Sequence, residues 1–232
     1  MVTSGGTREK IDDVRCITNL STGTLGSLIC GALAGLENCE KIFYVCGIDA
    51  ALPRSGNTEI IPVSDTISVI NAVKNILSNN NIDAIIHAMA VSDYRVKSVR
   101  TGGARLGGAK PGGVELERGQ KISSNESEII LVLEPTPKVI SLFNILSPRA
   151  LLVGFKLLCN VTEKELIDTA YNLLQKNSCA FVIANDKNFI TETKHKAYLI
   201  DKNKNYTEFE TKKKIANGIA DKLKHLLNGL CL

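Results

Sequence analysis

Short apolar runs alternate with longer amphipathic stretches along most of this 232-residue chain. The runs are nearly continuous, which is typical of strands in a parallel sheet covered on both faces. They predict buried strands over Lys41–Cys46, Asp83–Ala88, Glu128–Leu133, Ala150–Phe155 and Phe181–Ala184. Helices are expected over Gly23–Leu36, Asp65–Leu77, Pro137–Ile145 and Thr162–Lys176. This order predicts an α/β fold, a three-layer Rossmann-like fold with a mostly parallel, doubly wound sheet.

Two segments depart from the alternation. Near the end of the chain, KAYLID and YTEFE flank KNKN and predict a C-terminal hairpin, followed by an amphipathic helix over Lys212–Leu227. Residues 95–121 are basic, rich in glycine and without apolar periodicity, so they predict a long flexible loop. From composition alone, that loop fits a linker between two domains as well as a cationic flap over an anionic ligand.

Composition excludes several classes of protein. No apolar run reaches the roughly 18 residues of a membrane span, and the N-terminus has no signal-peptide core, so a soluble cytoplasmic protein is expected. The net charge of +4 and 5% aromatic content argue against nucleic-acid binding but suit small anionic substrates. Seven cysteines without C-x-x-C spacing predict reduced, mostly buried thiols rather than a zinc site.

Glycines occur at two places where a ligand could approach backbone. Gly5 and Gly6 in TSGGT follow a short apolar start, and glycines after a strand admit a ligand at the carboxyl edge of a sheet. Ser21 and Gly23 precede an expected helix, whose free N–H groups favour an anion. The alternatives are a tight turn and an ordinary Ser/Thr helix cap. Neither segment has the register of a dinucleotide site or of a P-loop.

Three polar residues are candidates for chemistry. The Asn19 carboxamide can both donate to and accept from a substrate carboxylate, although asparagine is also a common turn residue. Asp93, in AMAVSDYR, suits a magnesium ion or a sugar hydroxyl, or else a helix cap. Lys121 closes the basic segment, where it can neutralise phosphate charge or simply be solvated.

Taken together, the blocks TSGGTREKIDDVRCITNLSTGTLG, HAMAVSDYR, KISS, EPTPKVI, VGFK and VIAND resemble phosphopantothenate–cysteine ligase, also called phosphopantothenoylcysteine synthetase. The resemblance runs from Val2 to about Asp186. It implies a single ligase domain over residues 1–232, with 95–121 as a flexible flap. No flavin-dependent decarboxylase half precedes these blocks, so the monofunctional bacterial type is expected.

The resemblance implies a step of coenzyme A biosynthesis. A nucleoside triphosphate activates the carboxylate of 4′-phosphopantothenate as an acyl-nucleotide and releases pyrophosphate. The amine of L-cysteine then displaces the nucleoside monophosphate and gives 4′-phosphopantothenoylcysteine. A bacterial type implies CTP, with ATP as the alternative, Mg²⁺ and a homodimer.

The resemblance also implies roles for individual residues. The implied catalytic residues are Asn19 and Lys121. Asn19 would hold the pantothenate moiety and the acyl intermediate, and Lys121 would be needed for the reaction to proceed beyond the acyl-nucleotide. Arg15 is implied to reach the substrate phosphate from the neighbouring subunit, and Asp93 to lie near the metal. The implied substrate-binding residues are Arg15, Asn19, Ala88, Met89 and Ala90. The implied nucleotide-binding residues are Gly5, Gly6, Ser21, Gly23, His87, Met89, Asp93, Lys121, Pro137, Lys138, Val139, Ile140, Phe155 and Lys176.

Two other functions are compatible with the predicted fold. A regulatory protein that binds a nucleotide without ligase activity is the main alternative, but Asn19, Asp93 and Lys121 are all present. A Rossmann oxidoreductase requires G-x-G-x-x-G after the first strand, and TSGGTREKIDD lacks that register.

Overall fold

The computed structural model describes residues 1–101, 114–116, 121–125, 128–191 and 193–229. Its main sheet has eight strands in the order β13-β12-β11-β10-β6-β1-β4-β5. The parallel strands are β1 (Val2–Ser4), β4 (Ile42–Gly47), β5 (Thr58–Val63), β6 (Ala84–His87), β10 (Leu151–Leu158) and β11 (Phe181–Asp186). The antiparallel hairpin of β12 (Ala197–Asp201) and β13 (Tyr206–Phe209) forms one edge. The predicted mostly parallel sheet with a C-terminal hairpin is therefore confirmed.

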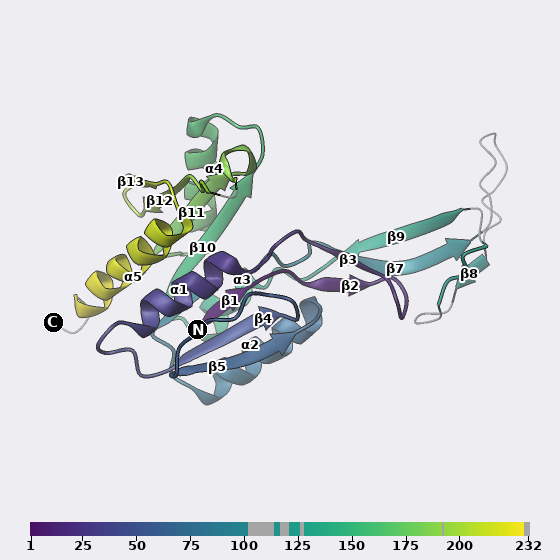
Figure 1. Ribbon diagram of the computed structural model, residues 1–232, viewed down its shortest axis with the longest axis horizontal. Helices are drawn as coiled ribbons and strands as arrows, with labels where there is room; N and C mark the ends of the chain where they lie inside the picture. Colours follow the sequence, from purple (N-terminus) through teal and green to yellow (C-terminus); the bar gives the residue numbers. More distant parts are fainter. Residues whose placement is uncertain (102–113, 117–120, 126–127, 192, 230–232) are drawn as a thin grey trace.

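Helices cover both faces of this sheet (Figure 1). On one face α1 (Thr24–Ala34) and α5 (Lys212–Asn228) bury Ile29 and Ile219 against it. On the other face α2 (Thr66–Asn79), α3 (Ile140–Leu146) and α4 (Glu163–Lys176) contribute Val73, Phe143 and Leu166 to a second core. The predicted three layers are thus confirmed.

The starts of α4 and α3 can be compared with the predicted ones. At α4, Thr162 accepts from Glu165 N–H while the Glu165 side chain accepts from Thr162 N–H, which is the predicted capping box. The expected start of a helix at Pro137 is wrong, because α3 begins only at Ile140. Just before it, Thr136 N–H donates to Asp93 O at 2.9 Å, which ties this loop to the turn after β6.

A second, antiparallel sheet consists of β8 (Val114–Leu116), β7 (Tyr94–Thr101) and β9 (Ile129–Pro135), and it projects from the body (Figure 1). The expectation that Glu128–Leu133 is a buried strand of the main sheet is wrong, since Ile129 and Leu133 are 41% and 43% exposed. A flexible loop over all of 95–121 is also wrong, because 95–101 and 114–116 are strands. The rest of that segment, 102–113 and 117–120, lies outside the described residues.

A small hairpin of β2 (Arg8–Lys10) and β3 (Cys16–Thr18) carries the sequence between the two glycine segments, and the apolar pattern did not predict it. Six cysteines within the described ranges are free thiols, and Cys231 lies outside them. None of the helices in the described part of the chain combines the length and apolar character needed to cross a membrane.

Candidate active site

The order of strands reverses between β1 and β6, which creates a crevice at their carboxyl ends where α/β proteins commonly bind ligands. The predicted small-residue turns both lie here. Ala90 N–H donates to Gly5 O at 2.8 Å, and Thr7 N–H donates to Ala90 O at 3.3 Å. The turn after β1 and the turn Ala88–Ala90 after β6 therefore run side by side beyond the sheet.

Asn19 joins this pair of turns. It directly follows β3, is exposed, and donates from Nδ2 to Ala90 O at 3.1 Å. Gly6 makes the approach possible, since a Cβ at Gly6 would lie 2.9 Å from Asn19 O. Three segments that are distant in the sequence thus bring the predicted carboxamide against the predicted substrate-binding turn.

The start of α1 lies beside Gly5. Gly23 is the N-cap of α1, with a φ of 72°, and no side chain caps the helix. The alternative of an ordinary Ser/Thr cap is therefore wrong; Ser21 instead donates its N–H to Asn19 O at 2.9 Å. Gly5 and Gly23 both need to be glycine, because a Cβ on either would lie within 2.7 Å of Ala50 Cβ. Thr24 N–H, the first of the helix, has only a long contact of 3.5 Å to Thr22 Oγ1, and a helix start of this kind suits an anion.

His87 ends β6 and faces α3. Its Nδ1 lies 2.8 Å from Thr3 Oγ1, and its ring packs edge-on against Phe143 with centroids 5.1 Å apart. Burial lowers the pKa of His87 to about 4, so the imidazole is neutral at pH 7. His87 therefore contributes a polar neutral surface rather than a cation. Met89 next to it is buried, and any ligand contact would come through its backbone.

Asp93 meets the segment 137–140 that was predicted to contact the nucleotide. Lys138 Nζ lies 2.5 Å from Asp93 Oδ1, and both side chains are exposed. Pro137 is exposed in the same loop, whereas Val139 is buried in the core and Ile140 is partly buried beside it. The loop before α3 and the turn after β6 therefore form one wall of the crevice.

The described residues contain no group of three or more acidic, histidine or cysteine side chains arranged for a metal ion. Asp93 offers a single carboxylate. Mg²⁺ commonly binds proteins through one or two carboxylates and takes its other ligands from water and substrate phosphates. Asp93 therefore fits a magnesium ion only together with a phosphate-bearing ligand.

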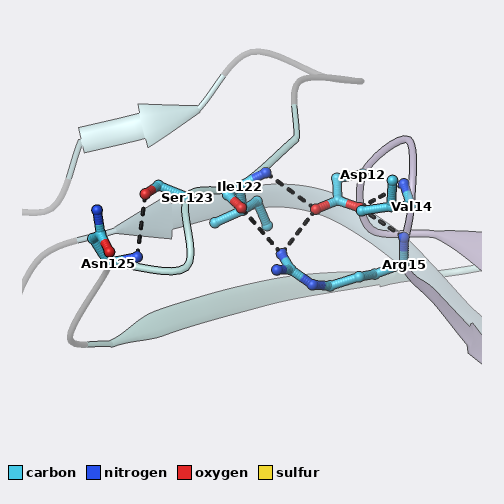
Figure 2. A network of polar contacts seen from close by, with 6 residues as sticks. All are labelled: Asp12, Val14, Arg15, Ile122, Ser123 and Asn125. Carbon is cyan, nitrogen blue, oxygen red and sulfur yellow. Dashed lines mark hydrogen bonds and ion pairs between the residues drawn. The ribbon is translucent and has the colours of Figure 1, made fainter.

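Arg15 lies at the turn between β2 and β3, apart from Asn19, and its side chain contacts Ile122, the residue after Lys121. Figure 2 shows Arg15 Nη1 donating to Asp12 Oδ2 at 3.0 Å and to Ile122 O at 3.4 Å. Lys121, the residue before Ile122, is exposed. Arg15 and Asn19 stand at opposite ends of β3, which separates their backbones by about 13 Å.

The last two predicted nucleotide contacts are unlike one another. Phe155 is partly buried on β10, opposite Ile183 of β11. Lys176 is the last residue of α4, whose 14 residues make the helix about 21 Å long. Because α4 begins at the carboxyl edge of the sheet, Lys176 lies at the opposite, amino edge. A contact between Lys176 and a nucleotide stays a prediction.

Sequence reasoning missed the residues that hold this site in place. Thr3 bonds His87, Thr7 Oγ1 accepts from Ser92 N–H at 2.9 Å, and Asp12 binds both Arg15 and Ile122. Asp12, the first aspartate of I-D-D-V-R, is of a residue type common in local turns. Its partner Ile122 is 110 residues away, so no local pattern could indicate that contact.

The model of the DNA/pantothenate metabolism flavoprotein C-terminal domain family matches residues 1–110 and 113–227. The coenzyme A biosynthesis bifunctional protein CoaBC of Methanocaldococcus jannaschii is 30% identical over 233 residues, which cover 98% of this chain and 50% of that protein. CoaBC of Thermococcus kodakarensis is 32% identical over 191 residues, 80% of this chain and 40% of that protein. The chain thus spans half or less of the length of these curated relatives.

A solved structure also resembles the whole chain. The crystal structure of the DNA/pantothenate metabolism flavoprotein from Streptococcus pneumoniae superposes with a TM-score of 0.81 at 34% identity. The match covers 97% of this chain and 97% of that one. Both the main sheet and the projecting sheet therefore fall within the aligned region.

Proposed function

Because this chain belongs to the DNA/pantothenate metabolism flavoprotein C-terminal domain family, we propose that it is a ligase of coenzyme A biosynthesis. It joins 4′-phosphopantothenate and L-cysteine through an acyl-nucleotide. The observation that carries the proposal is the bond from Asn19 Nδ2 to Ala90 O at the crevice between β1 and β6. A carboxamide against a turn of small residues is suited to holding a carboxylate where a phosphate can reach it.

Different residues of the chain have different roles in the first step. Asn19 and the backbone of Ala88–Ala90 orient the carboxylate, which attacks the α-phosphorus of the nucleotide and releases pyrophosphate. The start of α1, beside Gly5 and Gly23, binds nucleotide phosphates. Lys121 precedes Ile122, which contacts Arg15, so like Arg15 it would act in a neighbouring site, where it offsets charge that develops in the transition state. In the second step the cysteine amine attacks the activated carbonyl, a nucleoside monophosphate leaves and an amide bond forms.

The nucleotide is CTP or ATP, and the metal is Mg²⁺. Asp93 is the residue that would hold the metal, through its carboxylate, beside a phosphate-bearing ligand. When bound, Mg²⁺ neutralises part of the phosphate charge that would otherwise repel the substrate carboxylate. Lys138, which contacts Asp93 at 2.5 Å, is then free to contact a phosphate.

The working form is a homodimer in which Arg15 reaches the 4′-phosphate. Arg15 stands at the tip of the β2–β3 hairpin, away from Asn19 of its own chain, which favours a role in a neighbouring site. Its planar guanidinium is suited to a phosphate through two parallel hydrogen bonds.

The proposal is tested by incubating the protein with 4′-phosphopantothenate, cysteine, Mg²⁺ and either CTP or ATP. Pyrophosphate and 4′-phosphopantothenoylcysteine should appear together, with the better nucleotide identified by competition. Asn19→Asp and Lys121→Gln should each reduce turnover by about a hundredfold or more, as expected for the loss of a transition-state contact.

Matched controls come from exposed positions on α5. Asn217→Asp and Lys224→Gln make the same chemical changes far from the crevice and should leave turnover unchanged. The ligase proposal is rejected if neither nucleotide supports product formation. Nucleotide binding without product would favour the regulatory alternative instead.

A further inference from the structure

Asp12 is a buried carboxylate at the turn between β2 and β3, with a side chain only 1% exposed. Figure 2 shows that both of its oxygens are occupied. Oδ1 accepts from Val14 N–H at 2.9 Å and Arg15 N–H at 2.7 Å. Oδ2 accepts from Ile122 N–H at 3.1 Å and from Arg15 Nη1 at 3.0 Å.

The two carboxylate oxygens of Asp12 have different structural roles. The bonds to Oδ1 close a local turn, as aspartates in turns commonly do. The bonds to Oδ2 are not needed for that turn: they bind the guanidinium of Arg15 and the backbone of a segment 110 residues away. Desolvation opposes ionisation of Asp12, but these N–H groups and the Arg15 charge together lower its pKa.

Each hydrogen bond to Oδ2 restrains a segment that carries an exposed cation. One fixes the Arg15 side chain directly, and the other fixes Ile122, whose preceding residue is Lys121. Arg15 Nη1 also donates to Ile122 O at 3.4 Å, so the two segments are joined twice. Only Nη1 of Arg15 is used in these contacts, and a guanidinium has further donors on Nε and Nη2.

We propose that Asp12 is a positioning residue that holds Arg15 and Lys121 as a pair of cations in a fixed arrangement. This inference rests on the proposed ligase function for the chemistry, in which both cations act on anionic groups of the reaction. Pre-ordering matters because a displacement of about 1 Å at a reacting group can cost a hundredfold in rate. Asp12 itself touches neither substrate.

The experiment is a double-mutant cycle on KM and kcat. Asp12→Asn removes the charge but keeps the shape, and should raise KM for 4′-phosphopantothenate about tenfold through Arg15. It should also lower kcat through Lys121, while KM for the nucleotide changes less than about twofold. In an Arg15→Gln background, Asp12→Asn should raise the phosphopantothenate KM by less than about twofold, because the side chain it positions is already gone.

The control is Asp13→Asn, the same change at the exposed neighbouring residue, which should leave both constants unaltered. Melting temperatures identify variants that fail to fold. If Asp12→Asn is among them, Asp12→Glu, which keeps the charge, is used in its place. Additive effects on KM in the double variant, or wild-type constants in a folded Asp12→Asn protein, overturn the inference.

Hydrogen exchange separates this inference from the proposed function. Residues 121–125 should exchange at least about tenfold faster in Asp12→Asn than in Asp13→Asn, whether or not the protein makes product. Unchanged exchange overturns the inference even in an active ligase. Absence of product from the unmodified protein rejects the function, while faster exchange still supports the link between the two segments.

Discussion

At the scale of single residues, His87 shows how packing sets the charge of a site. Burial lowers its pKa from 6.5 to about 4, and the same cause lowers that of His195 to about 4. The unfolded chain therefore binds protons that the folded chain rejects. Above about pH 6.5 the two histidines do not reduce the free energy of unfolding. As the pH drops from there towards 4, the free energy of unfolding falls by up to about 1.4 kcal/mol per histidine and pH unit.

Urea unfolding at several pH values checks this expectation. His87→Asn, which keeps a polar atom near Thr3, should remove about half of the fall between pH 6.5 and 4, because His195 still contributes the rest. The exposed His225 on α5 supplies the control, and His225→Asn should leave the slope unchanged. An identical slope in His87→Asn would contradict the neutral state of this imidazole in the folded protein.

At the scale of elements, two glycines of α1 differ in the space around them. A Cβ at Gly26 would lie 2.2 Å from Ser4 Oγ of β1, whereas one at Gly31 would meet nothing within 4 Å. We expect Gly26→Ala to destabilise the protein by about 1–3 kcal/mol through overpacking. Gly31→Ala should stabilise it by about 0.5–1 kcal/mol, because glycine weakens a helix interior. Denaturant unfolding measures both, and equal effects would contradict the close contact between α1 and β1.

Most elements of the body were predictable because their signals are local. One capping box, near-continuous apolar runs and a polar turn indicated α4, β4, β6, β10 and the β12–β13 hairpin. The strand β9 shows the limit of that reasoning. Its run of apolar residues resembled a central strand, but whether an apolar face is covered depends on which elements pack against it. The short strands β2 and β3 carried no apolar period at all, so their pairing was not predictable.

At the scale of the whole molecule, the projecting sheet carries an apolar face that is only partly covered in the single chain. Val99, opposite Leu131, is buried, whereas Ile129 and Leu133 are 41% and 43% exposed. Ile129, Leu131 and Leu133 alternate along β9 and therefore share one side of it. A sheet of few strands needs its apolar face covered to be stable. We expect a second copy of the chain to cover it, and sedimentation at micromolar concentration should give a dimer.

A charge on this face should weaken the dimer. Leu133→Lys is expected to raise the dimer dissociation constant about tenfold or more, since it puts a charge into an apolar contact. Ile67 on α2 has a similar exposure, 41% against 43% for Leu133, so Ile67→Lys is the matched control. A monomer in the unmodified protein would contradict the expectation, as would equal effects of the two substitutions.

The sequence by itself determined the layered α/β body and the motifs by which the site could be anticipated, because periodicity, helix caps and glycine turns act over a few residues. Only the tertiary structure decided which motifs meet. Asn19 reaches Ala90, and Asp12 joins Arg15 to Ile122, across 71 and 110 residues. It also set Lys176 at the far edge of the sheet. Such distances follow from the order and direction of strands, which are fixed when the whole core packs.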